Sequence, residues 1–345
     1  MVHKITFFNH KGGVGKTTSV FHIGWMLGRL GKRVLLVDAD SQCNLTKISI
    51  GENYEQYYID HPNSNLKSAL SVAFESQPKL IEAVECYQIP ENENVFLLPG
   101  SFDITEYEVQ LGVSFQMANS FGVMKHLPGA FNYLIEKTAH QYNVEYILID
   151  LNPSLGALNQ DVLISSDYFI IPCSPDYFSK MAIESLAQKL PSWERWAKNA
   201  REFFSESTYP IPFNTPKFLG YTINDYTIKS GGPTKSFQSI IEDIAITVNN
   251  VLVPNLEKTG MLLSSESYQG EYLLSQIPNF QSFQAKYQQY SIPIFELTAE
   301  QIGSTGLVLE NQQSMQKRFY EIFQSLTEKI IRQIEHATSP NAVQA

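Results

Sequence analysis

Residues 10–18 (HKGGVGKTT) combine the residue types that bind the phosphates of a nucleotide. The three glycines carry no Cβ, so the backbone can turn tightly and bring several N–H groups onto phosphate oxygens. Lys16 would place its ammonium on the β- and γ-phosphates, and the Thr17 hydroxyl would bind Mg²⁺. The chemistry indicated is the binding of a nucleoside triphosphate together with magnesium.

The flanking residues predict the elements that would hold this loop in place. The apolar run at residues 5–8 predicts a strand, and residues 20–30 have helical spacing. A strand, a glycine loop and a helix in this order are the context that a phosphate-binding loop requires. The N-terminus of the helix would add N–H donors and a favourable dipole for an anion.

Two further apolar runs end in aspartate. Residues 34–37 precede Asp38 and Asp40, and residues 146–149 precede Asp150. Both runs are apolar throughout, as parallel strands buried on both faces should be, and such folds bind ligands at the carboxyl ends of their strands. Asp150 fits the Walker-B arrangement, in which the carboxylate holds the magnesium shell.

Length and composition narrow the class of protein. The chain has 345 residues, 43% of them hydrophobic, and a formal net charge of −10. This acidic balance argues against a surface that binds nucleic acid throughout, although it leaves room for a local basic patch. The three cysteines, at 43, 86 and 173, follow no metal or disulfide spacing. We expect a cytoplasmic protein with reduced thiols and without a signal sequence or a membrane span.

The loop resembles the deviant sequence Lys-Gly-Gly-x-Gly-Lys-Thr of the ParA/MinD group of P-loop ATPases, which residues 9–18 match without a gap. The resemblance implies ATP and Mg²⁺ as ligands, and implies that Lys11 reaches the phosphates of a partner's nucleotide across a two-fold axis. Asn224 aligns with the position that meets the adenine, and Pro278 with an Ile-Pro-Arg segment that packs on the base, here with Asn279 in place of arginine. The implied nucleotide-binding residues are Lys11, Gly12, Gly13, Val14, Gly15, Lys16, Thr17, Thr18, Asn224 and Pro278.

The same resemblance assigns roles to the carboxylates. Asp38-Ala39-Asp40, followed by Gln42, matches the first switch of the family, so Asp40 would orient the attacking water and Asp38 would support the magnesium shell. Residues 152–156 (NPSLG) resemble the second switch, with Asn152 where the family has a proline. The implied catalytic residues are Lys11, Lys16 and Asp40, and the implied metal residues are Thr17, Asp38 and Asp150.

The resemblance implies an α/β fold, a mainly parallel sheet with helices on both faces. We expect one domain over residues 1–336, enlarged by insertions near 104–130, 199–217 and 227–276, and a disordered tail at 337–345. Helical spacing is present at residues 66–74, 131–141, 180–196, 240–252 and 313–334.

The function implied is slow ATP hydrolysis that switches the chain between a monomer and a nucleotide-sandwich homodimer. In the family this cycle serves plasmid or chromosome partitioning or cargo positioning, with a ParB-like or other partner that stimulates hydrolysis. Weak nonspecific DNA binding, and with it association with the nucleoid, would use basic side chains near the C-terminal helices. The candidates are Lys286, Lys317, Arg318, Lys329 and Arg332.

Other classes are weighed against this one. A MinD-like membrane ATPase would end in a short basic amphipathic helix, whereas the last predicted helix mixes lysine and arginine with glutamate and a polar tail follows it. An iron–sulfur carrier would need paired cysteine ligands. A nucleotide-gated subunit of a larger regulatory or defence complex stays open, and the insertions and the acidic charge favour it somewhat.

Overall fold

The computed structural model describes residues 2–117, 122–229, 232–233 and 235–339. The strands are β1 (His3–Phe7), β2 (Val34–Ala39), β3 (Tyr87–Gln88), β4 (Val95–Leu98), β5 (Tyr146–Leu151), β6 (Tyr168–Cys173), β7 (Lys217–Tyr226), β8 (Ile228–Lys229), β9 (Gly232–Pro233) and β10 (Leu273–Pro278). The strands predicted near residues 5, 34 and 146 are confirmed.

The helices lie between these strands. The α-helices are α1 (Lys16–Arg29), α2 (Asn44–Ile50), α3 (Tyr54–Asp60), α4 (Leu66–Phe74), α5 (Thr105–Met117), α6 (Ala130–Gln141), α7 (Ala157–Ser165), α8 (Tyr177–Phe203), α9 (Lys235–Thr247), α10 (Val253–Glu257), α11 (Phe283–Tyr290), α12 (Ala299–Ile302) and α13 (Gly306–Thr338). The short helical turns are η1 (Gly51–Asn53), η2 (Phe102–Ile104), η3 (Gly122–His126), η4 (Val248–Leu252), η5 (Ser265–Tyr268) and η6 (Ile294–Glu296).

Eight strands form one sheet in the order β10-β7-β6-β1-β5-β2-β4-β3, and every neighbouring pair in it is parallel except β3 with β4. The register pairs Phe7 with Asp150, and Asp150 in turn with Asp38. The carboxyl ends of β1, β5 and β2 therefore meet at one point of the sheet edge, where folds of this kind bind their ligands. The predicted fold class is confirmed.

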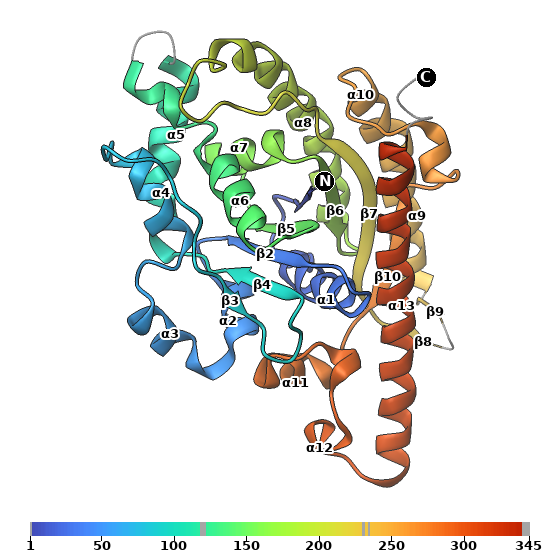
Figure 1. Cartoon of the computed structure of the whole chain (residues 1–345). Coiled ribbons are helices and arrows are strands. Elements are labelled where there is room, and N and C mark those ends of the chain that lie inside the picture. Colours follow the sequence, from blue (N-terminus) through green and yellow to red (C-terminus); the bar gives the residue numbers. More distant parts are fainter. Residues whose placement is uncertain (1, 118–121, 230–231, 234, 340–345) are drawn as a thin grey trace.

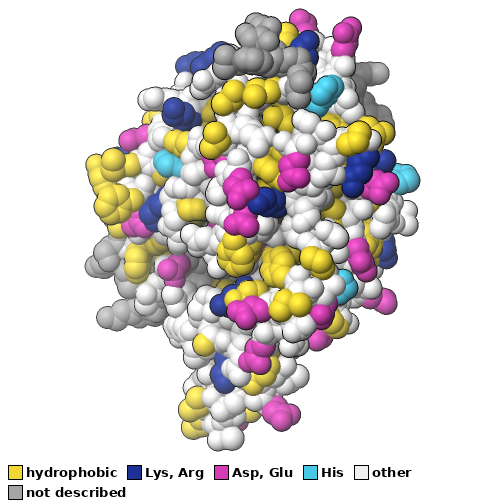
Figure 2. Space-filling model, turned by 90° about the vertical axis from the view of Figure 1, so that its left-hand side faces the viewer, with side chains coloured by type: hydrophobic (Ala, Val, Ile, Leu, Met, Phe, Trp, Pro, Cys, Tyr) yellow, Lys and Arg dark blue, Asp and Glu magenta, His cyan; other side chains and the backbone are white. Residues whose placement is uncertain are grey.

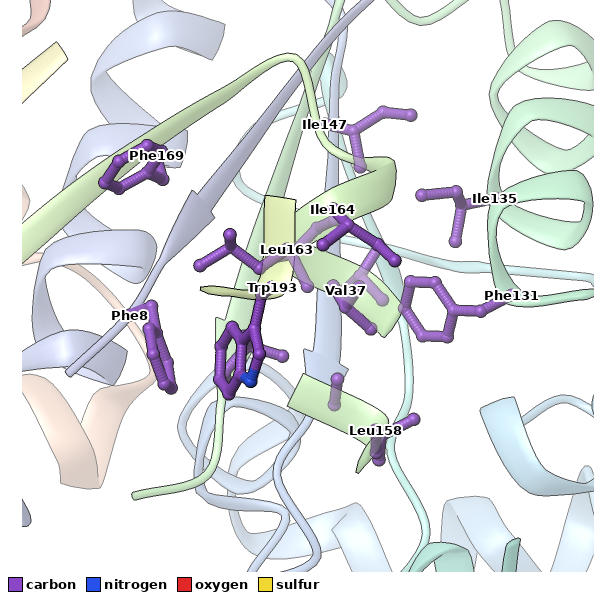
Figure 3. Packing of buried hydrophobic residues seen from close by; sticks show 14 of the residues in the cluster. Phe8, Val37, Phe131, Ile135, Ile147, Leu158, Leu163, Ile164, Phe169 and Trp193 are labelled. Carbon is purple, nitrogen blue, oxygen red and sulfur yellow. The ribbon is translucent and has the colours of Figure 1, made fainter. Parts of the chain in front are cut away.

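Helices cover both faces of the sheet, because its strands alternate between two hydrophobic cores. Along β2, Leu35 and Val37 belong to the core under α4 to α10, whereas Val34 and Leu36 belong to the core under α1, α2 and α11 to α13. Figure 3 shows part of the first core, where Phe131 of α6 and other helix residues surround the strand residues. Figure 1 shows α13 running along the side of the molecule next to β10.

Several element ends differ from the prediction. The last helix spans Gly306–Thr338 rather than 313–334, so the start of the predicted tail is helical, and residues 340–345 lie outside the described part of the chain. Its first turns extend with α12 beyond the rest of the molecule in Figure 1. The predicted insertion at 104–130 contains α5 and η3, and that at 227–276 contains α9, the π-turn η4 and α10. Of the predicted insertion at 199–217, the first five residues still belong to α8.

Candidate nucleotide-binding site

A cavity of about 520 Å³ opens at the carboxyl edge of the sheet. Residues 12–19 form one wall, Asp40 and Pro153 stand on the side of the two predicted switches, and Asn224 and residues 277–280 form the opposite wall. The cavity therefore gathers the ends of β1, β2, β5, β7 and β10. Its size and shape suit a small molecule whose charged end meets the glycine loop.

Two of the three loop glycines have a conformational reason to be glycine. Gly13 has φ +71° and Gly15 has φ +81°, a left-handed conformation that other residues rarely adopt. A Cβ on Gly15 would also come within 2.9 Å of Nδ2 of Asn224. Gly12 lacks this constraint, since its Cβ would meet only Pro153, at 3.9 Å. The tight turn thus depends on Gly13 and Gly15, and not equally on all three glycines as the sequence suggested.

The helix behind the loop begins without a side-chain cap. Gly15 is the N-cap residue of α1, and no side chain in the described residues accepts a hydrogen bond from the first turn. An uncapped N-terminus leaves backbone N–H donors available to an anion, and the helix dipole favours negative charge there. This end of α1 points to phosphate as the ligand.

The Lys16 side chain lies buried along the loop. Its Nζ donates to the backbone oxygen of Asn9 at 3.1 Å and to that of Lys11 at 3.4 Å. Burial lowers the pKa of Lys16, while the nearby carboxylates of Asp150 and Asp40 act in the opposite direction. An anion in the cavity would stabilise the charged form of this ammonium further.

Thr17 and Asp150 make the contact expected of a magnesium site. The Thr17 hydroxyl donates to Oδ2 of Asp150 at 2.6 Å, while Oδ1 of Asp150 is fully buried and has no hydrogen-bond partner among the described residues. Burial, the largest cause, raises the pKa of Asp150, and the Asp38 carboxylate adds to the rise. A cation beside this buried, unpartnered oxygen would relieve both effects.

The donor set fits Mg²⁺ bound together with phosphate. In the described residues no group of three or more His, Cys, Asp or Glu could hold a metal without other ligands. Magnesium at phosphate sites is held by one or two protein oxygens, with water and phosphate completing the octahedron. Thr17 Oγ1 and Asp150 are two such oxygens, and they lie next to the loop that would hold the phosphates.

Asp40 and Asp38 have different environments. Asp40 stands on the cavity wall, and its Oδ1 accepts a hydrogen bond from the backbone of Gln42 at 2.9 Å. Asp38 does not line the cavity: its Oδ2 accepts from both the backbone N–H and the hydroxyl of Thr46, each at 2.7 Å. Burial raises the pKa of Asp38 to about 7. The Asp38 carboxylate thus bonds to the start of α2, and its part in the magnesium shell stays a prediction.

The Lys11 side chain points away from the cavity of its own chain. Its Nζ forms an ion pair with Oδ2 of Asp176 at 2.6 Å. The other oxygen of Asp176 caps α8 by accepting from the backbone N–H of Ser179 at 2.9 Å. The sequence analysis missed Asp176, although the spacing of Asp176 and Ser179 at the start of a helix is an N-cap signal.

The predicted base-side residues lie on the cavity wall. Nδ2 of Asn224 donates to the backbone oxygen of Val14 at 2.7 Å, and its Oδ1 is buried without a partner in the described structure. Pro278, the last residue of β10, lines the cavity next to Asn279 and Phe280. Asn279 donates to Asp225, so the residue that replaces the family's arginine is held by a neighbouring side chain.

A buried histidine connects the phosphate helix to the C-terminal helix. His22 of α1 stacks on Phe323 of α13 at 4.8 Å between ring centroids, and its Nε2 lies 3.3 Å from the backbone nitrogen of Ile294. Burial lowers the pKa of His22 to about 3, so the ring is neutral. Phe323 also lines the cavity, and this contact, which the sequence did not indicate, makes α13 part of the site.

The strand–loop–helix unit, with Lys16 and Thr17 on the cavity wall and Asp150 bonded to Thr17, defines a P-loop nucleotide-binding protein. A family model described as an AAA domain matches residues 2–200, more than half of the chain. The chain belongs to this family and, with its deviant loop, to the ParA/MinD type of P-loop ATPases. The resemblance found in the sequence is confirmed.

The similar curated proteins include bacterial and archaeal relatives. An uncharacterised protein of Methanocaldococcus jannaschii is 27% identical over 262 residues, which cover 74% of this chain and 88% of that protein. An uncharacterised protein of Mycobacterium tuberculosis is 33% identical over 51% of this chain and 48% of its own length. The sporulation initiation inhibitor protein Soj of Bacillus subtilis is 30% identical over 54% of this chain and 62% of its own length. The chain thus spans about half to nearly two thirds of the last two proteins.

Solved structures share the fold. A protein of Corynebacterium diphtheriae superposes with a TM-score of 0.63 at 25% identity, covering 84% of this chain and 97% of its own. McdA of Cyanothece follows with 0.62 at 16% identity, covering 96% and 100%. A plasmid partition protein of Borrelia burgdorferi bound to AMPPNP gives 0.54 at 18% identity, covering 92% and 100%. Within the described residues, no helix combines the length and the apolar character needed to cross a membrane.

Proposed function

We propose that this chain binds Mg²⁺-ATP in the cavity, hydrolyses it slowly, and switches between a monomer and a homodimer that holds the nucleotides between its subunits. The observation that carries the proposal is the Thr17–Asp150 pair, with its unpartnered buried carboxylate oxygen, beside the uncapped N-terminus of α1. Both features suit Mg²⁺-bound phosphate and would otherwise cost stability. The partition protein of the same fold that is bound to AMPPNP supports the nucleotide part of this proposal.

The phosphates would lie on the loop and the base near Asn224 and Pro278. Backbone N–H groups of the loop and the Lys16 ammonium would hold the β- and γ-phosphates, and Thr17 and Asp150 would hold Mg²⁺. Held by Thr17 and Asp150, Mg²⁺ would supply positive charge against the charge that develops during transfer. The loop would orient the γ-phosphate for attack.

Asp40 is the residue of this chain best placed to act on the attacking water. Its carboxylate stands on the cavity wall, and only its Oδ1 is used, by the backbone of Gln42. A carboxylate there can accept a hydrogen bond from a water molecule and so direct the lone pair of that water to phosphorus. Asp38, whose oxygens bond to Thr46 and to the backbone of Asp40, is left out of this proposal.

The second copy would approach the mouth of the cavity. Lys11 lies there on the surface of the loop, and three exposed apolar side chains stand on the first turns of α8 beside its partner Asp176: Tyr177, Phe178 and Met181, with exposed fractions of 66%, 69% and 49%. A partner subunit would cover them. Lys11 would then exchange Asp176 for the partner's phosphates and stabilise charge as the bond breaks.

Partition or cargo positioning is the biological role that we propose for this cycle, with a stimulating partner and weak ATP-dependent DNA binding. The basic candidates on α13 are not all free, since Nζ of Lys329 donates to the backbone of Leu273 and burial lowers its pKa. On the side of the molecule that carries α3, α4 and α5, acidic and basic side chains are interspersed (Figure 2). DNA contact through this face should therefore be weak.

The test is a titration with Mg²⁺-ATP by calorimetry, with light scattering and phosphate release on the same samples. We expect ATP binding that chelation of Mg²⁺ weakens, a doubling of mass with ATP and none with ADP, and slow phosphate release. A gel shift at low salt, run with ATP and with ADP, tests DNA binding. The protein should bind DNA only with ATP, and the binding should weaken steeply as the salt concentration rises. A protein that binds no ATP would contradict the whole proposal. One that binds ATP and stays monomeric would favour a nucleotide-gated subunit of a larger complex.

A further inference from the structure

The segment after β5, residues 152–156, has no regular structure, yet it connects the Asp150 strand to α7 and carries Pro153, which lines the cavity. It is tied down from its C-terminal side by Asn159. Nδ2 of Asn159 lies 2.9 Å from the backbone oxygens of both Asn152 and Ser154. Below, this segment is called the second switch.

The N-terminus of α7 lacks a cap of its own. Gly156 is its N-cap residue and has no side chain to accept from the first N–H groups of the helix. The Glu108 carboxylate on α5 lies against this N-cap residue, where it can act as the acceptor for the backbone N–H of Ala157. A carboxylate at a helix N-terminus is favourable, because it satisfies a free donor and complements the dipole.

Gly156 and Glu108 fit each other sterically. A Cβ on Gly156 would overlap the Glu108 carboxylate and stand 2.6 Å from its Cδ. The carboxylate thus lies directly on the backbone where the second switch turns into α7. The charged group is half-buried there, and this burial raises its pKa.

The helix that carries Glu108 is fixed at other points. The ring of Tyr107 stacks on Phe74 of α4 with 4.2 Å between centroids, and Phe115 packs on Trp196 of α8 at 4.3 Å. Leu111 is buried between these contacts. Because α4 and α8 hold α5 on both sides, Glu108 is attached to a firm support when it holds the start of α7.

We infer that Glu108 is a positioning residue for the second switch: from α5 it fixes the N-terminus of α7, and with it Pro153 and the chain that follows Asp150. This inference rests on the proposed function. Glu108 does not line the cavity, so it would act through the switch and not on the nucleotide. Its removal should slow turnover without weakening the hold of the phosphate loop on ATP.

The test compares Glu108→Ala and Glu108→Gln with the control Glu106→Ala. Glu106 lies on the same helix, but its carboxylate is exposed and pairs with Lys67 at the surface. We expect Glu108→Ala to lower kcat by about five- to tenfold, as the loss of one capping interaction would. The ATP affinity should stay within about twofold, since affinity is set by the loop. Glu108→Gln should recover much of the rate because its amide oxygen still accepts from Ala157, and Glu106→Ala should match the parent protein.

A second measurement does not depend on hydrolysis. Amide hydrogen exchange of residues 152–158 in the nucleotide-free protein should be faster in Glu108→Ala than in the parent protein and in Glu106→Ala. Unchanged exchange there, or an unchanged kcat in an active protein, would overturn the inference, and so would equal losses of rate and of ATP affinity. If exchange rises but the parent protein hydrolyses no ATP, the positioning role holds and the proposed function is the part that fails.

Discussion

The phosphate loop and the second switch leave neighbouring strands at the same edge of the sheet, yet their shapes have different origins. The turn of the loop, residues 10–18, is set mainly by its own residues, because Gly13 and Gly15 have positive φ and Lys16 bonds to backbone oxygens of residues 9 and 11. Asn224 and Ser174 add hydrogen bonds to its backbone from outside. The second switch takes its shape from side chains outside it, Asn159 on one side and Glu108 on the other.

Because of this difference, we expect the phosphate loop to govern nucleotide binding and the second switch to govern turnover. A loop whose turn is set mainly by its own glycines should keep its affinity for phosphate when helices on the far side of the sheet move. A switch held from α5 and α7 responds to whatever moves those helices, and so it suits the step that must be regulated. Substitutions in and around the two segments should therefore have different consequences.

The largest effect should come from Lys16→Ala. The substitution removes the one ammonium of the loop that lies along its own cavity, and ATP affinity should fall by roughly a hundredfold, as for the loss of a charge-assisted interaction of about 3 kcal/mol. Calorimetry with Mg²⁺-ATP measures it. Lys32→Ala is the control, since Lys32 pairs with Glu145 at the opposite end of the strands. Equal affinities of Lys16→Ala and the parent protein would remove the loop from the proposed site.

The sequence predicted the loop because the glycines and the lysine that set its turn lie within ten residues. The strands were equally readable, since a central parallel strand must be apolar on both faces and β2, β5 and β6 are buried throughout. The carboxyl ends of these strands also placed Asp40 and Asp150 correctly on the sheet edge.

The sequence did not show which side chains contact the predicted site residues. Asp38 ends an apolar run just as Asp150 does, and only the packing of α2 shows that Thr46 takes up its carboxylate. The support of the second switch by Glu108 comes from nearly fifty residues earlier in the chain, in a segment that the sequence indicated only as an insertion. Contacts of this range depend on the three-dimensional arrangement of helices, which spacing along the chain does not encode.

A smaller effect, on stability, tests the two origins of shape directly. Gly15→Ala should lower the free energy of unfolding by about 1–2 kcal/mol, because an alanine at φ +81° is strained. Gly156→Ala should lower it by about 1 kcal/mol, because the new Cβ displaces Glu108 from its capping position. Urea denaturation of both variants gives these values.

The paired double variants separate the two causes. Adding Glu108→Ala to Gly156→Ala should cost little more than either change alone, because both remove the same cap. Adding Asn224→Ala to Gly15→Ala makes room for the Cβ but leaves the backbone strain, so it should restore nothing. If the losses of unfolding free energy add up in Gly156→Ala with Glu108→Ala, the two changes do not act on one cap. If Asn224→Ala restores stability to Gly15→Ala, the loss in Gly15→Ala does not come from backbone strain.

The smallest effect concerns Lys11, a loop residue whose side chain forms an ion pair with Asp176 at the start of α8. Asp176→Asn keeps the cap of α8, since asparagine accepts from Ser179 as well as aspartate does, but it removes the charge that holds Lys11. The ion pair is partly exposed and therefore weak, so its loss should promote ATP-dependent dimerisation by about two- to fivefold in ATP concentration. Light scattering across an ATP titration measures the shift, and Glu145→Gln, which breaks another partly exposed pair with a lysine, is the control.

Lys11→Ala should instead abolish dimerisation while ATP still binds. If Asp176→Asn also impairs dimerisation, Asp176 supports the active position of Lys11, and the ion pair belongs to the machinery of the dimer rather than to the resting monomer.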